Sequence, residues 1–328
     1  MRMTPSSCCP RWPEAVARPM RDLAATIGNT PMVELPHLAP SPRIRLFAKL
    51  EGANPTGSVK DRIAQAMISE ARASGALLPG QAILEPSSGN TGISLAMIGA
   101  LLGHPVRIVM PDNTTPEREQ LLRLYNAEIV FSPGAEGSNG AIRMAQELSA
   151  ADPSLFMPYQ YGNPANPRAH EDGTGPEILA AVPDVDVFVA GLGTGGTLTG
   201  VGRFLKRERR GVRVIAAEPL PGERVQGLRS LDDGFVPPVL DASVLDDRYL
   251  VGNRDAVVGV RRLLREEGIF AGLSSGAAFH VALRAASEME QGNVVVLLAD
   301  GGWKYLSTGI YDRDLDDLED QLDGSLLW

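Results

Sequence analysis

Short apolar runs rich in β-branched residues alternate along this 328-residue chain with longer segments in which apolar residues recur at helical spacing. A run that is apolar without alternation predicts a strand buried on both faces, because a strand with one solvated face would alternate apolar and polar residues. Such strands, separated by helices, indicate an α/β fold with parallel sheets and helices on both faces. We expect strands at residues 82–84, 106–110, 128–131, 185–190, 212–217 and 294–298.

The loop after the first expected strand has the composition of an anion-binding turn. Ligands of parallel α/β proteins bind at the carboxyl ends of strands, and here Ser87-Ser88-Gly89-Asn90-Thr91 opens an apolar helix. Backbone N–H groups at a helix start, together with the hydroxyls of Ser87, Ser88 and Thr91, suit a carboxylate. The Asn90 amide can donate to a phenolate oxygen. The same residue types are common helix caps, so this loop alone does not separate binding from capping.

A second loop, after the strand expected at 185–190, is rich in Gly and Thr and precedes another helix. It suits a phosphate, which we expect to be held by Gly193, Thr194, Gly195, Gly196 and Thr197. A rival interpretation is a dinucleotide-dependent oxidoreductase, because this loop also fits G-x-G-x-x-G and the next strand ends in an acidic residue. That fingerprint usually stands early in a nucleotide-binding domain, and it leaves the Ser-Asn loop unexplained.

Lys60 stands where the turn sequence at 54–59 enters a helix. We expect the positive end of the helix dipole and neighbouring cations to favour its free amine, the form that attacks an aldehyde. An isolated lysine would be interpreted as a solvated surface residue. A third loop, residues 272–277, places Ser274 at a helix start, where its hydroxyl can cap the helix and lie beside a pyridine nitrogen. Because a hydroxyl does not enforce a protonated ring, Ser274 favours β-elimination over transamination.

Composition and charge limit the classes of partner. With 44% hydrophobic residues the chain can bury one or two ordinary cores, and its net charge of −9 argues against nucleic acid and anionic membranes. The only cysteines, Cys8 and Cys9, are adjacent, so a mutual disulfide would be strained, and metal-ligand spacing is absent. We see no signal peptide or membrane span and expect a cytoplasmic protein. Residues 1–20 are expected to be a disordered tail or an over-long gene start, with Met20 as the true first residue.

The four loops occur in the order seen in fold-type II pyridoxal phosphate enzymes, and the chain resembles the cysteine synthases over about residues 22–328. The runs Ile-Gly-Asn-Thr-Pro at 27–31 and Gly-Asn-Pro-Ala-Asn-Pro at 162–167 are also typical of that family. The resemblance implies a tryptophan synthase β-like fold whose two subdomains each hold a twisted, mostly parallel sheet flanked by helices. A smaller mobile subdomain would span 55–165 and a larger one 21–54 plus 166–309, with the Pro/Asn-rich stretch at 159–167 as the hinge.

The same resemblance assigns roles to the loops. It implies pyridoxal 5'-phosphate attached to Lys60, with the ring held by Asn90 and Ser274 and the phosphate in the Gly193–Thr197 cradle. The substrate carboxylate would bind the Ser-rich loop and Gln160. It also implies a homodimer.

A narrower resemblance rests on residues 159–163, 228–237 and 301–309, which are similar to the actinobacterial, phosphoserine-using branch of cysteine synthases. In that branch the sulfur donor is the thiocarboxylated C-terminus of a small ubiquitin-like carrier protein. The resemblance implies that Arg229 binds the substrate phosphate, and a guanidinium offers the bidentate hydrogen bonds that phosphate accepts. It also implies that the acidic tail at 310–328, which ends in Leu-Leu-Trp, folds over the cleft.

The expected reaction is β-replacement on an activated serine through an aminoacrylate, with Lys60 removing and returning the α-proton. An O-acetylserine sulfhydrylase that uses sulfide or thiosulfate is the alternative within the family. Threonine dehydratase and cystathionine synthase share the scaffold, but we find no added regulatory or haem-binding module in this sequence that would favour them. Outside the family, the alternatives are the dinucleotide-dependent oxidoreductase and a non-catalytic binding protein.

Overall fold

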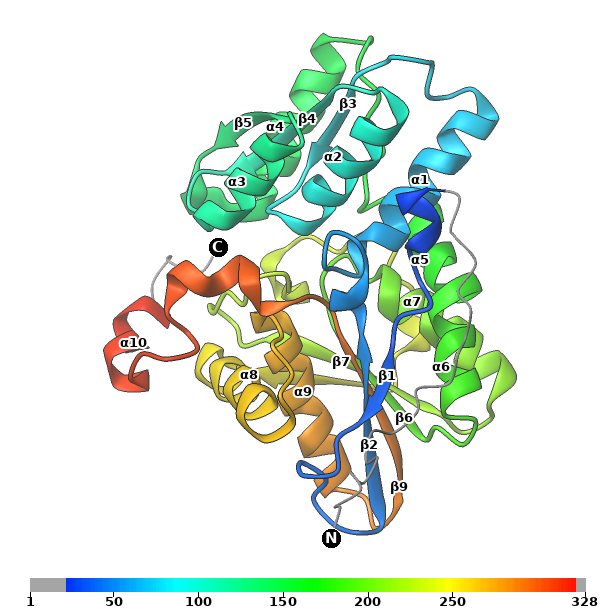
Figure 1. Ribbon diagram of the computed structural model, residues 1–328, viewed down its shortest axis with the longest axis vertical. Helices are drawn as coiled ribbons and strands as arrows, with labels where there is room; N and C mark the ends of the chain where they lie inside the picture. The colour runs from blue at the N-terminus through cyan, green and yellow to red at the C-terminus, as the bar shows by residue number, and fades with distance from the viewer. Residues whose placement is uncertain (1–21, 323–328) are drawn as a thin grey trace, which may run out of the picture.

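The structure, a computed structural model, describes residues 22–322 and consists of two sheets with helices on both faces (Figure 1). The expectations for Cys8, Cys9, Met20 and the final Leu-Leu-Trp lie outside the described residues. The strands are β1 (Met32–Glu34), β2 (Ile44–Leu50), β3 (Ile83–Pro86), β4 (Val106–Pro111), β5 (Glu128–Ser132), β6 (Val187–Gly191), β7 (Arg213–Pro219), β8 (Asp247–Val251) and β9 (Gly292–Leu298).

The helices follow the strands in the order that an α/β fold requires. They are α1 (Lys60–Ser74), α2 (Asn90–Leu102), α3 (Pro116–Leu124), α4 (Gly137–Ala151), α5 (Ala165–Ala169), α6 (Gly175–Ala181), α7 (Gly196–Glu208), α8 (Asn253–Glu267), α9 (Leu273–Ser287) and α10 (Leu315–Leu322).

The larger sheet has the strand order β1-β2-β9-β6-β7-β8, and all its neighbouring pairs are parallel except β1 with β2. Alternate residues of its central strand β6 enter two different cores. Val187 and Val189 pack with residues of α8 and α9, whereas Phe188 and Ala190 pack with residues of α6 and α7. Burial on both faces explains why β6 is a continuous apolar run, as its sequence predicts.

The smaller sheet contains the parallel strands β3, β4 and β5. Residues of α1 and α2 form one core with it, around Ile108, and residues of α4 form a second core around Val109. The α/β fold with two mostly parallel, helix-flanked sheets is therefore confirmed. The division at residues 55 and 165 stays a prediction, although the segment from α1 to α4 is the one that surrounds the smaller sheet (Figure 1).

Strands β1, β2 and β8 were not expected, and the sequences of β2 and β8 explain why these two were missed. Strand β2 contains Lys49, a residue that argues against a buried strand. Its side chain is only 2% exposed, and Nζ lies 2.6 Å from both the carbonyl oxygen of Thr30 and Oε2 of Glu177. Strand β8 is a polar edge strand of alternating burial. Both strands depend on partners distant in sequence, which a local apolar pattern does not reveal.

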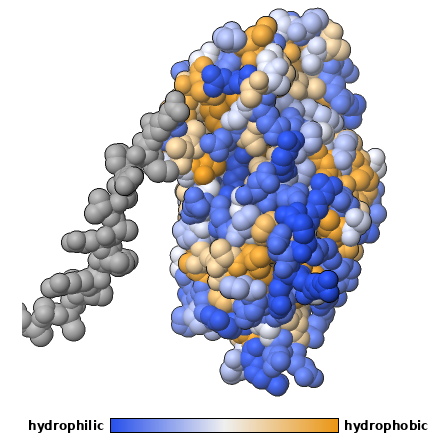
Figure 2. All heavy atoms as spheres, turned by 90° about the vertical axis from the view of Figure 1, so that its right-hand side faces the viewer, coloured by the Kyte–Doolittle hydropathy of each residue, from blue (hydrophilic) through white to orange (hydrophobic). Residues whose placement is uncertain are grey.

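The acidic segment near the C-terminus is helical over α10, and Leu318 joins the core that also contains residues of α8. In another view, apolar patches on one face are separated by hydrophilic side chains (Figure 2). Among residues 22–322, no helix is both long and apolar enough to cross a membrane.

Candidate active site

Lys60 is the first residue of α1, at the end of a loop that two other elements fix in place. The N–H of Val59 donates to the carbonyl oxygen of Ala299, just after β9, at 2.8 Å. The N–H of Thr56 donates to Oδ2 of Asp61 at 2.7 Å, and Ser94 of α2 donates to the other oxygen of that carboxylate at 2.6 Å. The expected entry of a loop into a helix at Lys60 is confirmed, and the loop bridges the two sheets.

Burial lowers the pKa of the Lys60 amine, and the negative charges of Asp300 and Glu51 oppose this shift. The free amine is therefore favoured by desolvation. The expectation that neighbouring cations lower the pKa is wrong, because the charged groups that act on Lys60 are carboxylates brought in from other elements.

In the Ser-rich loop after β3, Ser87 accepts backbone hydrogen bonds and can still donate its own hydroxyl proton to a ligand. Ser87 Oγ accepts hydrogen bonds from the N–H groups of Gly89 and Gly92 at 3.2 and 3.0 Å, so Ser87 satisfies backbone donors at the start of α2, where Gly89 is the N-cap residue. Thr91 Oγ1 donates to Oε1 of Gln160 at 2.7 Å, and Gln160 is 3% exposed. The loop and the crossover segment thus form one polar wall of the cavity.

Gln160 is placed by a buried carboxylate that the sequence did not single out. Both oxygens of Glu85 accept backbone N–H groups, from Tyr159 at 2.8 Å and from Gln160 at 2.9 Å. Tyr159 has a φ of 57°, which a non-glycine residue rarely adopts. The hydrogen bonds to Glu85 hold this turn and direct the Gln160 side chain toward Thr91.

The Gly/Thr loop between β6 and α7 has the close backbone packing of a phosphate cradle. A Cβ on Gly193 would lie 2.8 Å from the carbonyl oxygen of Gly227, and Gly195 has a φ of 84°. Thr194 Oγ1 accepts from Nδ2 of Asn166 at 3.0 Å. Thr197 Oγ1 lies 3.2 Å from Nε2 of the buried His170.

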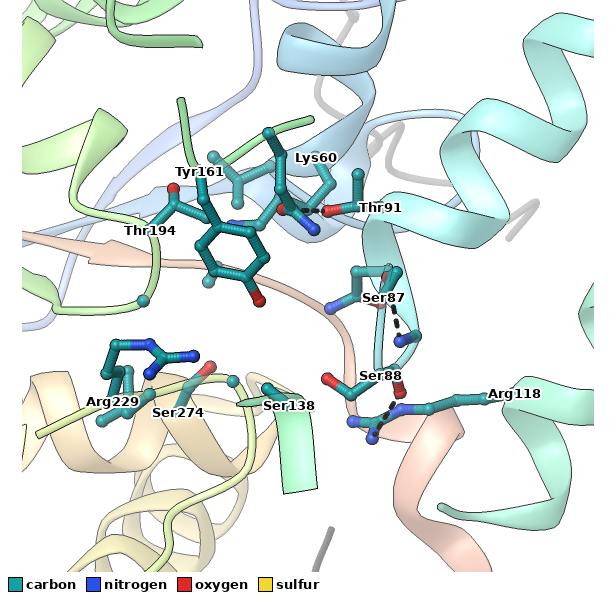
Figure 3. A pocket seen from close by; sticks show the side chains of 18 residues that line it. Lys60, Ser87, Ser88, Thr91, Arg118, Ser138, Tyr161, Thr194, Arg229 and Ser274 are labelled. Atoms are coloured by element: carbon teal, nitrogen blue, oxygen red, sulfur yellow. Dashed lines mark hydrogen bonds between the residues drawn. The ribbon is translucent and has the colours of Figure 1, made fainter. Parts of the chain in front are cut away.

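Arg229 lies in the segment between β7 and β8 of the larger sheet and reaches the cavity from the side opposite the Ser-rich loop (Figure 3). It is 8% exposed, and its guanidinium lies 4.8 Å from the ring centroid of Phe235 and 5.5 Å from that of Tyr161. Nη1 donates to Oδ1 of Asn139, near the start of α4, at 2.8 Å. Its contacts in the described part of the chain are thus with an amide oxygen and aromatic rings, none of them anionic.

The structure brings nearly all the residues expected from the sequence to one cavity and an adjoining pocket. Gly196 is the exception, because it lines neither the cavity nor the pocket, and a Cβ at this position would clash with the side chain of Asn166. The expected residues that line the cavity or the pocket are Lys60, Ser87, Ser88, Asn90, Thr91, Gln160, Gly193, Thr194, Gly195, Thr197, Arg229 and Ser274. Their roles toward ligands stay predictions.

Sequence reasoning missed other residues that line the cavity, among them Arg118, Ser138 and Tyr161 (Figure 3). Arg118 is 3% exposed, its guanidinium lies 4.8 Å from the ring centroid of Tyr305, and Nη1 donates weakly to the carbonyl oxygen of Ser88 at 3.4 Å. Arg118 lies on a helix with an ordinary charged surface pattern, so no local signal identifies it.

Comparison with known proteins identifies the family to which this site corresponds. The family described as "Pyridoxal-phosphate dependent enzyme" matches residues 23–300. A relative from Staphylococcus aureus (strain Mu50 / ATCC 700699), named cysteine synthase, is 43% identical over 307 residues, which cover 90% of this chain and 99% of the relative.

Solved structures agree with that match. The crystal structure of O-ureido-L-serine synthase is similar with a TM-score of 0.85 at 42% identity, and the match covers 90% of this chain and 96% of that one. The crystal structure of cysteine synthase (OASS) from Entamoeba histolytica has a TM-score of 0.84 at 33% identity over 99% of both chains. One scaffold thus carries proteins named for different products.

Proposed function

This chain belongs to the family of pyridoxal-phosphate dependent enzymes, and we propose that within it the protein is a cysteine synthase that prefers O-phosphoserine. Membership of this family gives both Lys60 and the Gly/Thr loop a role in binding one cofactor. The dinucleotide-dependent interpretation of that loop is therefore set aside. The β-substitution class follows from the relatives, and the choice of substrate is the finer part of the proposal.

The residues around the cavity fit the cofactor. The cradle at Gly193 and Gly195 has the close backbone approach and the positive φ that a phosphate-binding turn uses. Lys60 would attach the aldehyde carbon, with Ser274 and Asn90 beside the ring. Pyridoxal 5'-phosphate, once bound, supplies the electron sink that makes the α-proton of an amino acid acidic.

The proposed work of the protein side chains is binding and proton transfer. The Ser87 hydroxyl and the remaining N–H of the Gln160 amide would bind the substrate carboxylate, and Thr91, whose hydroxyl proton goes to Gln160 Oε1, would hold that amide in place. The desolvated amine of Lys60 would take the α-proton as the Cβ–O bond breaks, and would return it after the Cβ–S bond forms. Because burial favours the uncharged amine of Lys60, it is suited to the role of base at neutral pH.

The environment of Arg229 is the observation that supports O-phosphoserine as the substrate. A buried guanidinium without an anionic partner among the described residues lines the same cavity as Lys60. A phosphate monoester would supply that partner, whereas a neutral acetyl ester would leave the charge uncompensated. The rings of Tyr161 and Phe235 and the amide of Asn139 restrict the guanidinium to this position.

The proposed sulfur donor is the thiocarboxylated C-terminus of a small ubiquitin-like carrier protein. Its support is the sequence resemblance of residues 159–163, 228–237 and 301–309, and sulfide or thiosulfate is the alternative donor. A homodimer, a cytoplasmic location and closure of the site by the C-terminal tail are proposals of the same standing.

The test of the substrate proposal is kcat/KM for O-phosphoserine and for O-acetylserine in Arg229→Ala. We expect kcat/KM for O-phosphoserine to fall about 100-fold, as for a lost charge-assisted hydrogen-bonded pair, and kcat/KM for O-acetylserine to change little. Arg203→Ala, which removes a surface arginine paired with Asp241, is the control and should change neither value. An equal fall for both substrates would refute the assignment of Arg229 to phosphate.

A further inference from the structure

We propose that Lys304 is a positioning residue that fixes the orientation of the Asn90 amide, so that an Asn90 N–H is presented to the cofactor. This inference rests on the proposed function, since it concerns how the cofactor ring is held. Lys304 belongs to the 3₁₀ helix η7 (Gly302–Thr308) after β9, and Asn90 begins α2 beside the smaller sheet. The two residues are 214 positions apart and meet at the wall of the site.

Lys304 is a fully buried lysine, which is a rare position for a charged side chain. Its Nζ donates to Oδ1 of Asn90 at 2.7 Å and reaches the carbonyl oxygen of Gly57 at 3.4 Å. Its backbone is held as well, because Thr115 Oγ1 donates to the Lys304 carbonyl oxygen at 2.8 Å. The shortest hydrogen bond of this buried amine is therefore to the neutral side-chain oxygen of Asn90.

The Asn90 amide has a carboxylate on its other side. Nδ2 of Asn90 donates to Oδ2 of Asp300 at 2.8 Å, and the Tyr305 hydroxyl donates to the same oxygen at 2.8 Å. Burial lowers the pKa of Lys304 to about 8, with Asp300 opposing the shift, so near neutral pH the group is an ammonium with donors only. The Lys304 donor at Oδ1 and the Asp300 acceptor at Nδ2 therefore favour the same orientation of the Asn90 amide.

A flipped amide would lose both hydrogen bonds. Its NH₂ group would face the ammonium of Lys304, and its oxygen would face the carboxylate of Asp300. In the observed orientation, Asp300 takes one of the two N–H groups of Nδ2, which leaves the other for a ligand. Asn90 lines the cavity, so that remaining donor is available where the cofactor oxygen is expected.

The test is a double-mutant cycle on cofactor binding, measured by titrating the apo-protein with pyridoxal 5'-phosphate and following visible absorption. We expect Lys304→Met and Asn90→Ala each to raise the apparent Kd about tenfold, the effect of one lost charge-assisted hydrogen bond. Because Lys304→Met acts through the Asn90 amide, which Asn90→Ala removes altogether, the double variant should also be about tenfold weaker, not 100-fold. Lys206→Met, which removes a surface lysine paired with Asp246, is the matched control and should leave Kd unchanged.

A purely structural role for Lys304 predicts a different result. Lys304→Met would then lower Tm but leave Kd unchanged, or its effect would multiply with that of Asn90→Ala, and either outcome would overturn the inference. If Lys304→Met does not fold, Lys304→Leu, which also lacks a donor, takes its place in the same cycle. Wild-type protein that binds no pyridoxal 5'-phosphate would instead overturn the proposed function together with the inference.

Discussion

The Thr91 hydroxyl donates to Oε1 of Gln160 at 2.7 Å, and this bond joins the start of α2 to the crossover segment 69 residues later. Both side chains line the cavity that contains Lys60. The wall proposed for the substrate carboxylate is thus assembled by a hydrogen bond that exists without substrate.

Thr91→Val should therefore weaken substrate binding more than it slows the chemistry. The valine keeps the shape of the side chain and loses the hydroxyl, which leaves Gln160 Oε1 without its donor. We expect KM for the amino-acid substrate to rise about tenfold with kcat changed less than threefold, measured by steady-state kinetics. Thr26→Val, at an exposed threonine outside the site, is the control. A fall in kcat at constant KM would contradict this role of Thr91.

Lys60→Ala should abolish turnover, because the proposed base and the attachment point of the cofactor are the same amine. We expect activity to fall at least 1,000-fold, consistent with the loss of general-base catalysis and covalent attachment. The variant should keep its Tm within a few degrees, since truncation removes a desolvated amine. Activity within tenfold of wild type would show that another residue does this chemistry.

Glu177 should stabilise the fold in a pH-dependent way. Burial raises the pKa of its carboxyl, but hydrogen bonds from Arg62 and Lys49 more than offset this and lower the pKa to about 2. A carboxyl whose pKa is lowered by folding adds stability above its unfolded pKa of about 4.5, and loses that contribution as pH falls through about 2. Because the carboxylate is partly solvated, we expect Glu177→Gln to cost about 2 kcal/mol at pH 7.

Chemical denaturation of both proteins at several pH values measures this effect. The difference in the free energy of unfolding between wild type and Glu177→Gln should shrink below pH 4.5. A difference that is constant between pH 7 and pH 3 would mean that the carboxylate does not carry the stabilisation.

Gly57→Ala should disturb the site through the loop that holds Lys60. Gly57 has a φ of 79°, and an added Cβ would clash with the Trp303 ring. Gly211, with a φ of 85° and open space around it, is a matched control for the backbone penalty of about 1 kcal/mol. Gly57→Ala should lose cofactor affinity and change Trp fluorescence, whereas Gly211→Ala should lose only stability. Equal effects on cofactor affinity would contradict the proposed link.

Local sequence patterns were sufficient for the buried apolar strands β3, β4, β5, β6, β7 and β9 and for the binding loops, because Gly, Ser and Thr clusters directly follow several of these runs. They were insufficient where a residue takes its role from a distant partner. Lys49 is buried in β2 only because Glu177 and Thr30 receive its hydrogen bonds. The carboxylates that act on Lys60 come from other elements, so the negative charge near Lys60 could not be predicted from its neighbours in sequence. The contact of Asn90 with Lys304 could not be predicted locally either, because it joins distant parts of the chain.

The measurement that tests the account most directly is the ratio of kcat/KM for O-phosphoserine to that for O-acetylserine in the wild-type enzyme, with one sulfur donor kept constant. The buried guanidinium of Arg229, which faces the cavity without an anionic partner among the described residues, predicts a ratio of at least about ten. A ratio below one would contradict the phosphoserine assignment and favour an O-acetylserine-dependent enzyme on the same scaffold.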